Sequence, residues 1–129
     1  MKVRRPKKES RIGLLLLSKY NEENLCVIVV TRGLLSLDGI IVAEGSDNEI
    51  ITKILSEKMF KQVSFIVPLT QDSERIAYLL TSKANVSLIS ESDLVDNHIK
   101  KLLYEGYVKL TFKFTEKLIS LRKNMCKTN

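Results

Sequence analysis

His98, the only histidine of this 129-residue chain, is the side chain best suited to acid–base catalysis or metal binding near neutral pH. It lies one helical turn after Leu94 and one before Leu102, at the margin of an expected apolar stripe. Asp93 and Asp96 add metal-ligand types close by. No serine or cysteine nucleophile stands at a recognisable spacing. We therefore expect a structural histidine, with two carboxylates that cap and charge the start of a helix, where the helix dipole favours anions.

The two cysteines, Cys26 and Cys126, are too few for a disulfide scaffold or a thiolate zinc site. Cys26 lies within an apolar run, so we expect it to be buried and unreactive. Cys126 lies near lysines, which favour the thiolate form, but we interpret it as a bystander. The glycines are isolated, and the chain has no phosphate-binding loop and no dinucleotide-binding glycine pattern.

The charge of the chain is concentrated at its two ends. Its formal net charge is +6. Residues 1–11 carry six basic side chains against one acidic, residues 109–129 also carry six against one, and residues 12–108 carry nine against thirteen. An acidic body therefore lies between two cationic ends. Clustered positive charge attracts polyanions such as nucleic acids, but basic ends that only keep a protein soluble have the same composition.

Residues 107–115 alternate between polar and apolar side chains, which predicts a strand with one wet face at a sheet edge. On its polar face, Lys109 and Lys113 would contact phosphates and Tyr107 would stack on a base. Lysines that guard an edge strand against aggregation give the same pattern, so both interpretations stay open. The same strand is the expected route to a homo-oligomer. The predicted nucleic-acid-binding residues are Lys2, Arg4, Arg5, Lys7, Lys8, Tyr107, Lys109 and Lys113.

The first half of the chain predicts three strands in succession. Two apolar runs, residues 12–18 and 25–31, flank the polar stretch 19–24 and predict a β-hairpin. Their near-continuous apolarity indicates strands that are covered on both faces. A third run, residues 40–43, follows the turn-prone pair Asp38-Gly39 and predicts a third strand.

Helical spacing begins after Gly45. Ser46 and Glu49 match a capping box, and the apolar spacing predicts a helix that ends near Phe60. We next expect a strand over 63–69, a helix capped by Asp72 that ends near Lys83, and a strand over 85–90. A further helix is expected to begin near Asp93, to bury Ile99 and Leu102, and to stop at Gly106. The strand 107–115 and a short closing helix complete the predicted order.

This order predicts an α/β domain with a mixed sheet. An antiparallel three-stranded meander comes first, and the helical crossovers that follow make the later strands parallel. That is the layout of ribonuclease H-like folds. Residues 12–129 suffice for one such domain. Residues 1–11 contain Pro6 and almost no apolar side chain, so we expect a flexible basic arm.

Several segments resemble an archaeal family, domain of unknown function 99, which is itself similar to endonuclease V. The segments are Val-Val-Thr-Arg-Gly at 29–33, Leu-Asp-Gly-Ile at 37–40, Met59-Phe60 and the apolar run 63–67. The resemblance extends over most of the chain and is specific around residues 32–40. It implies a ribonuclease H-like scaffold. Enzymes of the endonuclease V type hold divalent metal on that scaffold with carboxylates that project from the sheet.

This chain departs from that pattern on two strands. Residues 12–17 read Ile-Gly-Leu-Leu-Leu-Leu where the family carries acidic residues, and residues 67–70 read Val-Pro-Leu-Thr where Asp-Gly is expected. Asp38 is the one carboxylate at a matching position, so the resemblance makes it a candidate catalytic residue, whereas its neighbour Gly39 favours a hairpin turn. A single carboxylate cannot assemble a metal pair. The resemblance therefore implies a scaffold that has lost its chemistry.

We therefore predict a non-catalytic domain, without a cofactor, that binds DNA or RNA through its basic ends. One alternative is a divergent nuclease that uses Asp38 with Mg²⁺ or Mn²⁺, and another is a protein-interaction subunit. The longest apolar run, residues 25–30, is too short to span a membrane. The apolar run after the basic start is too short for a signal peptide, so we expect a cytoplasmic protein without membrane contact.

Overall fold

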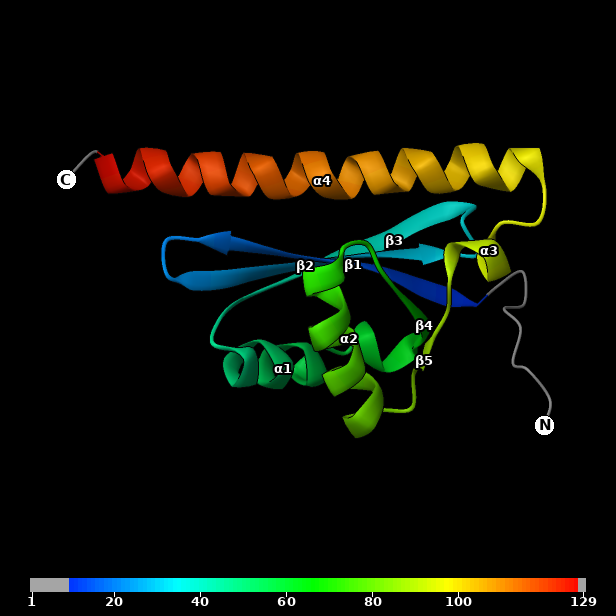
Figure 1. Ribbon diagram of the computed structural model, residues 1–129, viewed down its shortest axis with the longest axis horizontal. Coiled ribbons are helices and arrows are strands. Elements are labelled where there is room, and N and C mark those ends of the chain that lie inside the picture. Colours follow the sequence, from blue (N-terminus) through cyan, green and yellow to red (C-terminus); the bar gives the residue numbers. More distant parts are fainter. Residues whose placement is uncertain (1–9, 128–129) are drawn as a thin grey trace.

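The structure is a computed structural model that describes residues 10–127, with side chains described through residue 124. Within this part of the chain, five strands and four α-helices form an α/β fold (Figure 1). The elements are β1 (Arg11–Tyr20), β2 (Glu23–Arg32), β3 (Ser36–Gly45), α1 (Asp47–Ser56), a 3₁₀ helix η1 (Phe60–Gln62), β4 (Val63–Pro68), α2 (Gln71–Lys83), β5 (Ser87–Leu88), α3 (Glu91–Leu94) and α4 (His98–Lys127).

The sheet is mixed, as predicted, with the strand order β3-β2-β1-β4-β5. β2 pairs antiparallel with both β1 and β3. β4 pairs parallel with β1 and with β5. Helix α1 lies between β3 and β4 in the chain, and α2 lies between β4 and β5. These helices supply the crossovers that parallel pairing requires.

The described part of the chain is arranged in three layers. Helix α4 lies across one face of the sheet, and α1 and α2 cover the other face (Figure 1). Leu15 and Ile28 belong to the core cluster that includes α1 and α2, whereas Leu14 and Val27 belong to the cluster that includes Tyr104 of α4. Because successive side chains of a strand point to opposite faces, two covered faces explain the near-continuous apolar runs of β1 and β2.

The β1–β2 hairpin forms as predicted, with a shorter turn. The pairs Lys19–Asn24 and Tyr20–Glu23 extend the ladder into the stretch expected to be a loop. Asn21 has a φ of 56°, and asparagine tolerates this left-handed conformation better than most residues.

The second turn lies elsewhere than predicted. The chain turns at residues 33–35, where Gly33 and Leu34 have φ values of 57° and 65°. The predicted turn residue Asp38 instead lies within β3. The pairing of β2 with β3 shifts register between Val30 and Thr31, and Asp38 is the extra residue of that bulge. The turn-forming preference of Asp-Gly was overridden because Leu34, only 1% exposed, is buried in the core beneath α4.

Helix α1 begins as the sequence predicts. The Ser46 hydroxyl accepts a hydrogen bond from the Glu49 amide, and the Glu49 carboxylate accepts one from the Ser46 amide. The prediction for α2 is wrong in one detail, because Thr70 caps this helix and Asp72 lies within its first turn. The Thr70 side chain accepts from the Ser73 amide, which brings the helix start two residues earlier than expected.

The largest correction concerns the last third of the chain. The expected helix to Gly106, the strand 107–115 and the closing helix are replaced by the single 30-residue helix α4. The buried residues Tyr104, Thr111 and Thr115 recur at spacings of seven and four, which is helical periodicity.

Two buried threonines concealed this helical stripe. The Thr111 and Thr115 hydroxyls donate to the backbone carbonyls of Tyr107 and Thr111, so each polar group is satisfied within the helix. Because threonine is a polar residue, neither position belongs to the apolar pattern of the sequence. The apolar residues of this segment alternate with polar ones, as they would in a strand.

The start of this region also differs from the prediction. Residues 95–97 separate α3 from α4, and the Asn97 side chain accepts from the Lys100 amide at the start of α4. Ile99 and Leu102, predicted to be buried, are 70% and 55% exposed. The expected strand 85–90 shrinks to the two residues of β5. No helix in the described part of the chain combines the length and apolarity needed to cross a bilayer.

Candidate nucleic-acid interface

Helix α4 is a rigid platform about 45 Å long at a rise of about 1.5 Å per residue. Its inner face is held by the buried residues Tyr104, Thr111 and Thr115. Near its C-terminal end, Arg122 forms an ion pair with Glu44 of β3. The opposite face of α4 is therefore presented to solvent in a fixed orientation.

Three lysines occupy that outer face. Lys109, Lys113 and Lys117 are exposed and follow one another at intervals of four residues. Four residues advance a helix by about 400°, so the three side chains lie within about 80° of one another and span about 12 Å along the axis. None of the three forms an ion pair with another residue in the described part of the chain. We call these three residues the lysine row.

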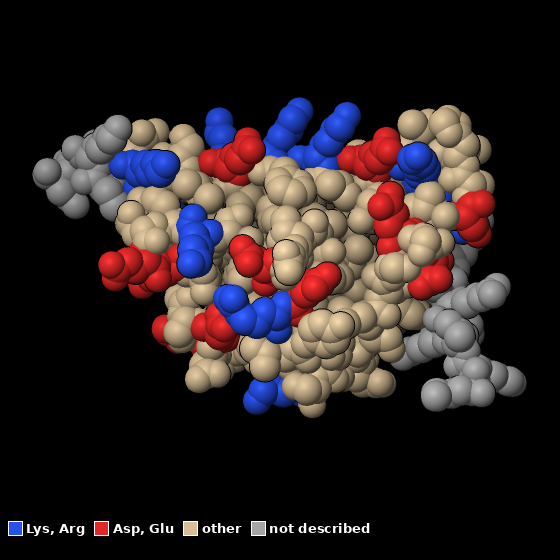
Figure 2. Space-filling view, in the orientation of Figure 1, with Lys and Arg blue, Asp and Glu red and all other residues tan. Residues whose placement is uncertain are grey.

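The lysine row belongs to a helix of opposite charge to the body that carries it. The α4 segment has eight basic side chains and two acidic ones, whereas residues 12–97 have seven basic and twelve acidic. Figure 2 shows Lys and Arg side chains projecting from the upper edge of the molecule, where Figure 1 places α4, with most of the acidic side chains of this view below them. The charge imbalance noted in the sequence is thus also a separation in space.

The structure brings together only part of the predicted nucleic-acid face. Lys109 and Lys113 share the outer face of α4, but Tyr107 packs against the core cluster beneath the helix. Two residues advance a helix by about 200°, so a tyrosine that would share a strand face with Lys109 points almost the opposite way on a helix. The structure therefore does not place Tyr107 on the same face as these lysines.

Two further predictions change with that segment. Residues 107–115 form no strand, so the edge strand through which a homo-oligomer was expected is absent. The predicted arm residues Lys2, Arg4, Arg5, Lys7 and Lys8 lie outside the described residues. Lys117 was not among the predicted site residues, although helical spacing from Lys109 and Lys113 would have identified it.

Asp38 lies in an ion-paired cluster. Its Oδ2 accepts from Arg11 Nε at 2.5 Å, and its Oδ1 lies 3.6 Å from Arg32 Nη2. The carboxylate thus joins β1, β2 and β3 at the bulge, and its side chain is 22% exposed. Met59 packs so closely over Gly39 that a Cβ there would lie 2.2 Å from the methionine methyl carbon. Among the described residues, no three His, Cys, Asp or Glu side chains form a group that could hold a metal ion.

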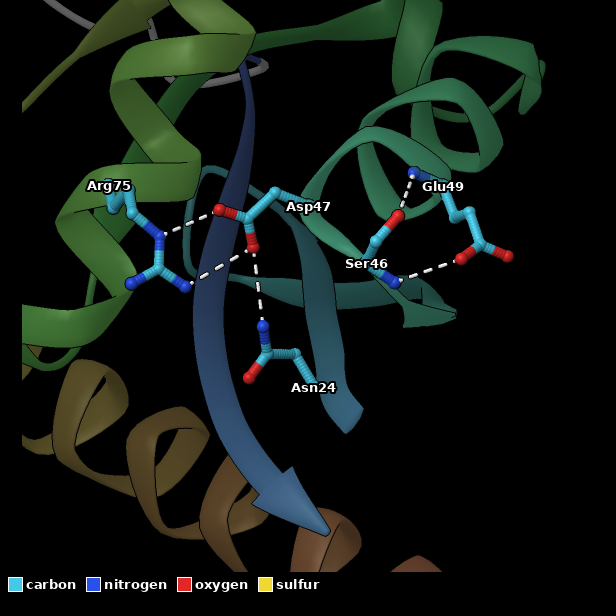
Figure 3. A network of polar contacts seen from close by, with 5 residues as sticks. All are labelled: Asn24, Ser46, Asp47, Glu49 and Arg75. Carbon is cyan, nitrogen blue, oxygen red and sulfur yellow. Dashed lines mark hydrogen bonds and ion pairs between the residues drawn. The ribbon is translucent and has the colours of Figure 1, made fainter. Parts of the chain in front are cut away.

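In α/β folds, ligands usually bind beside the carboxyl ends of parallel strands, here β1 and β4. An ion pair between Arg75 and Asp47 lies at this end of the sheet. Arg75 of α2 donates to Asp47 at the start of α1 through Nε at 2.9 Å and Nη2 at 3.2 Å. The Asn24 side-chain amide donates to the same carboxylate at 3.2 Å (Figure 3). The sequence analysis found the Ser46–Glu49 capping box drawn beside this network but not the network itself, because its members are more than 20 residues apart.

A shallow groove of about 440 Å³ lies at the opposite end of the sheet, where β4 begins and α2 ends. Its lining includes the buried residues Phe60, Val63 and Val86. Lys61 and Lys83 also line it, and no acidic residue does.

The remaining candidates of the sequence analysis are accounted for as follows. Cys26 is 1% exposed, and burial raises the pKa of its thiol to about 12, which confirms a buried cysteine. Cys126 belongs to the α4 backbone, but its side chain lies outside the described part. His98 is exposed at the first position of α4 rather than at the margin of a buried stripe. Asp96 pairs with Lys100 at 3.1 Å, and the Asp93 amide donates to the Ser90 hydroxyl that caps α3.

Comparisons with known proteins find no matching family model and no matching curated protein. Among solved structures, a crystal structure of a protein of unknown function from Archaeoglobus fulgidus DSM 4304 is 14% identical at a TM-score of 0.42, covering 74% of this chain and 67% of that one. A chain of the cryo-electron microscopy structure of the simian T-cell lymphotropic virus intasome with the PP2A regulatory subunit B56 gamma is 16% identical at a TM-score of 0.40. That alignment covers 95% of this chain and 46% of the other. Similarities this low do not assign the chain to a family.

Proposed function

We propose that this chain is a non-catalytic nucleic-acid-binding domain on a ribonuclease H- or endonuclease V-like scaffold. The observation that carries the proposal is the lysine row: three exposed, unpaired cations on one face of a rigid helix. Lysine ammonium groups bind phosphate oxygens as point charges. The basic N-terminal segment, residues 1–9, adds further cations to the same binding activity in this proposal.

The charge distribution supports a defined orientation on the nucleic acid. The acidic residues of the body repel phosphates, while α4 attracts them, so the potential of the whole molecule turns α4 toward a polyanion. Paired cations contribute less, because a carboxylate already neutralises them. Arg11, Arg75 and Arg122 are of this kind, and all three lie away from the lysine row in ion pairs with β3 or α1.

The surroundings of Asp38 support binding without cleavage. Both of its carboxylate oxygens face arginine side chains, and a guanidinium is positively charged at all ordinary pH values. A divalent cation at Asp38 would have to displace or repel Arg11. The adjacent segment of β1, Leu14 to Leu17, is apolar and at most 6% exposed. It therefore offers no carboxylate to share a metal with Asp38.

The decisive experiment compares two triple variants by fluorescence anisotropy with labelled DNA and RNA at several salt concentrations. The first replaces the lysine row, Lys109→Gln, Lys113→Gln and Lys117→Gln. Each neutralised duplex phosphate contributes about −0.9 to the slope of log K against log salt concentration, so we expect the slope to flatten by about 2.7 units. The affinity at low salt should fall with it.

The matched control replaces three exposed lysines near the other face of the sheet, Lys58→Gln, Lys61→Gln and Lys83→Gln. Both variants lose the same charge, so an effect confined to the first assigns binding to α4. An equal effect of the two would contradict the proposal, as would the absence of binding by the wild-type chain at low salt. With Mn²⁺ present the probe should remain intact. Cleavage that Asp38→Asn abolishes would instead support the nuclease alternative.

A further inference from the structure

We infer that β3 is an interaction surface for a second copy of this chain, and that the two β3 strands pair antiparallel around a two-fold axis. Among the described strands, β3 forms one end of the sheet. This edge differs from the lysine row, and pairing there does not depend on the proposed function. Its backbone, its composition, its charges and the apolar side chains beside it all favour self-association.

The outer edge of β3 offers backbone groups that no described strand pairs. Gly33 N–H donates to the Ser10 carbonyl at 2.8 Å, so these residues form a hydrogen-bonded pair at the end of the β1–β2 ladder. Bonded pairs alternate in an antiparallel ladder, so the odd-numbered residues of β2 bond to β1 and its even-numbered residues bond to β3. In the observed register, Ile40, Val42 and Glu44 therefore direct their N–H and C=O groups away from β2.

The edge at β3 lacks the features by which proteins usually keep edge strands apart. Lysine, proline and a very short strand are among these features. β3 has ten residues and contains neither lysine nor proline, whereas β5 at the other end of the sheet has two residues. The bulge at Asp38 interrupts only the beginning of β3. The segment 39–45, Gly-Ile-Ile-Val-Ala-Glu-Gly, remains available for pairing.

The charges of β3 are neutralised within the chain. Asp38 and Glu44 are its only charged residues. Asp38 pairs with Arg11 of β1, and Glu44 pairs with Arg122 of α4. Pairing at this edge therefore buries no charge that lacks a partner, which would be the costly case.

Such an edge is complementary to itself, because a two-fold axis sets the same outward groups against one another in reverse order. An axis at Val42 places this residue opposite its own copy and Ile40 opposite Glu44 of the second copy. The three outward residues then form about six hydrogen bonds, two for each bonded pair. An axis at Ile41 would instead place Asp38 opposite Glu44, and like charges directly opposite are destabilising. The register centred on Val42 is therefore favoured.

Helix α4 and β3 run in the same direction. Arg122 near the end of α4 pairs with Glu44 near the end of β3, and Tyr104 near the start of α4 shares a core cluster with Leu34, which precedes β3. Helices α1 and α2 form the crossovers on the opposite face of the sheet (Figure 1). Because such crossovers are right-handed, β3 lies to the right of an observer who looks along α4 from its start with the sheet beneath it.

Exposed apolar side chains line the flank of α4 on the β3 side. A right-handed helix turns clockwise away from that observer, so a residue that directly precedes an inward-facing one points to the right. Leu110, which precedes Thr111, is 37% exposed, and Leu121, which precedes Arg122, is 49% exposed. A two-fold axis perpendicular to the sheet keeps both copies of α4 on one face, and these leucines then face one another across the paired strands. Burial of apolar surface there adds to the backbone hydrogen bonds.

The test is sedimentation equilibrium of the full chain over a range of concentrations, at which the mass should rise from that of the monomer to twice that value. Val42→Lys and Val42→Glu each place like charges opposite one another at the axis, so each variant alone should remain monomeric. An equimolar mixture of the two should recover the dimer, because opposite charges then meet. Tyr78→Lys is the matched control, since Tyr78 of α2 is 62% exposed, and it should dimerise like the wild type.

Val42→Pro provides a second way to break the pairing. Its ring replaces an N–H that points away from β2, so the ladder within the chain stays intact, and circular dichroism should show a folded monomer. A wild-type chain that stays monomeric at every concentration overturns the inference. A dimer that persists in folded Val42→Lys and Val42→Pro overturns pairing through β3. A mixture of the Lys and Glu variants that stays monomeric overturns the axis at Val42.

Discussion

Replacing Gly106 by alanine tests the continuity of α4. Gly106 lies inside the helix, is exposed, and is not among the residues of positive φ. A Cβ added there meets no atom within 4 Å. The substitution therefore adds neither a clash nor buried area, and its effect is the difference in helix propensity between the two residues. We expect Gly106→Ala to raise the free energy of unfolding by about 1 kcal/mol.

The measurement is equilibrium unfolding in urea, followed by circular dichroism. With a slope of about 1–3 kcal/mol per molar urea, a gain of about 1 kcal/mol moves the midpoint up by about 0.3–1 M at constant slope. The melting temperature should rise by several degrees, because about 1 kcal/mol corresponds to about 2–8 °C for domains of roughly this size.

The sign of the effect decides between two structures. If Gly106 ended a helix in the left-handed conformation, as the sequence analysis expected, alanine would cost about 1–2 kcal/mol there. A destabilised Gly106→Ala would refute the continuous helix and, with it, the geometry of the lysine row. Gly45→Ala is the matched control. Gly45 has a φ of 118°, and a Cβ there would lie 3.0 Å from the Glu49 carboxylate, so this variant should be destabilised in the same assay.

Three further predictions test the packing around the site. Ser46→Ala removes the capping box and should cost about 1 kcal/mol in urea unfolding; an unchanged midpoint would show that α1 does not depend on its cap. In a Cys126→Ser background, Cys26 should resist Ellman's reagent at pH 8 until urea unfolds the chain, because burial raises its pKa to about 12, and rapid labelling of the native protein would contradict that burial. Thr111→Val should leave stability unchanged or raise it by up to about 1 kcal/mol, because the hydroxyl bonds only within its own helix and the site is otherwise apolar. A loss above about 1 kcal/mol would point to a further polar contact at that hydroxyl.

Several elements could be predicted from the sequence because their signals are local. The capping box of α1 joins residues three positions apart, and the β1–β2 hairpin joins two apolar runs across one polar stretch. Local hydrogen bonds and periodicity are sufficient in such cases. The α/β class with a mixed sheet followed from the order of these elements. The lysines at positions 109 and 113 could likewise be named from the sequence, because the polar positions of residues 107–115 and the basic C-terminal end both include them.

The geometry of the candidate site could not be predicted, because it depends on burial and on contacts distant in sequence. The apolar residues of 107–115 fit a period of two, and the helical period becomes visible only once the sheet is known to bury Thr111 and Thr115. The helix moves Tyr107 away from the lysines and adds Lys117 to them. The Arg11–Asp38 pair links residues 27 positions apart. Sequence alone thus determined which side chains are available. Only the tertiary structure decided which of them share a surface, because a side chain's direction depends on the period of its element and on which face that element buries.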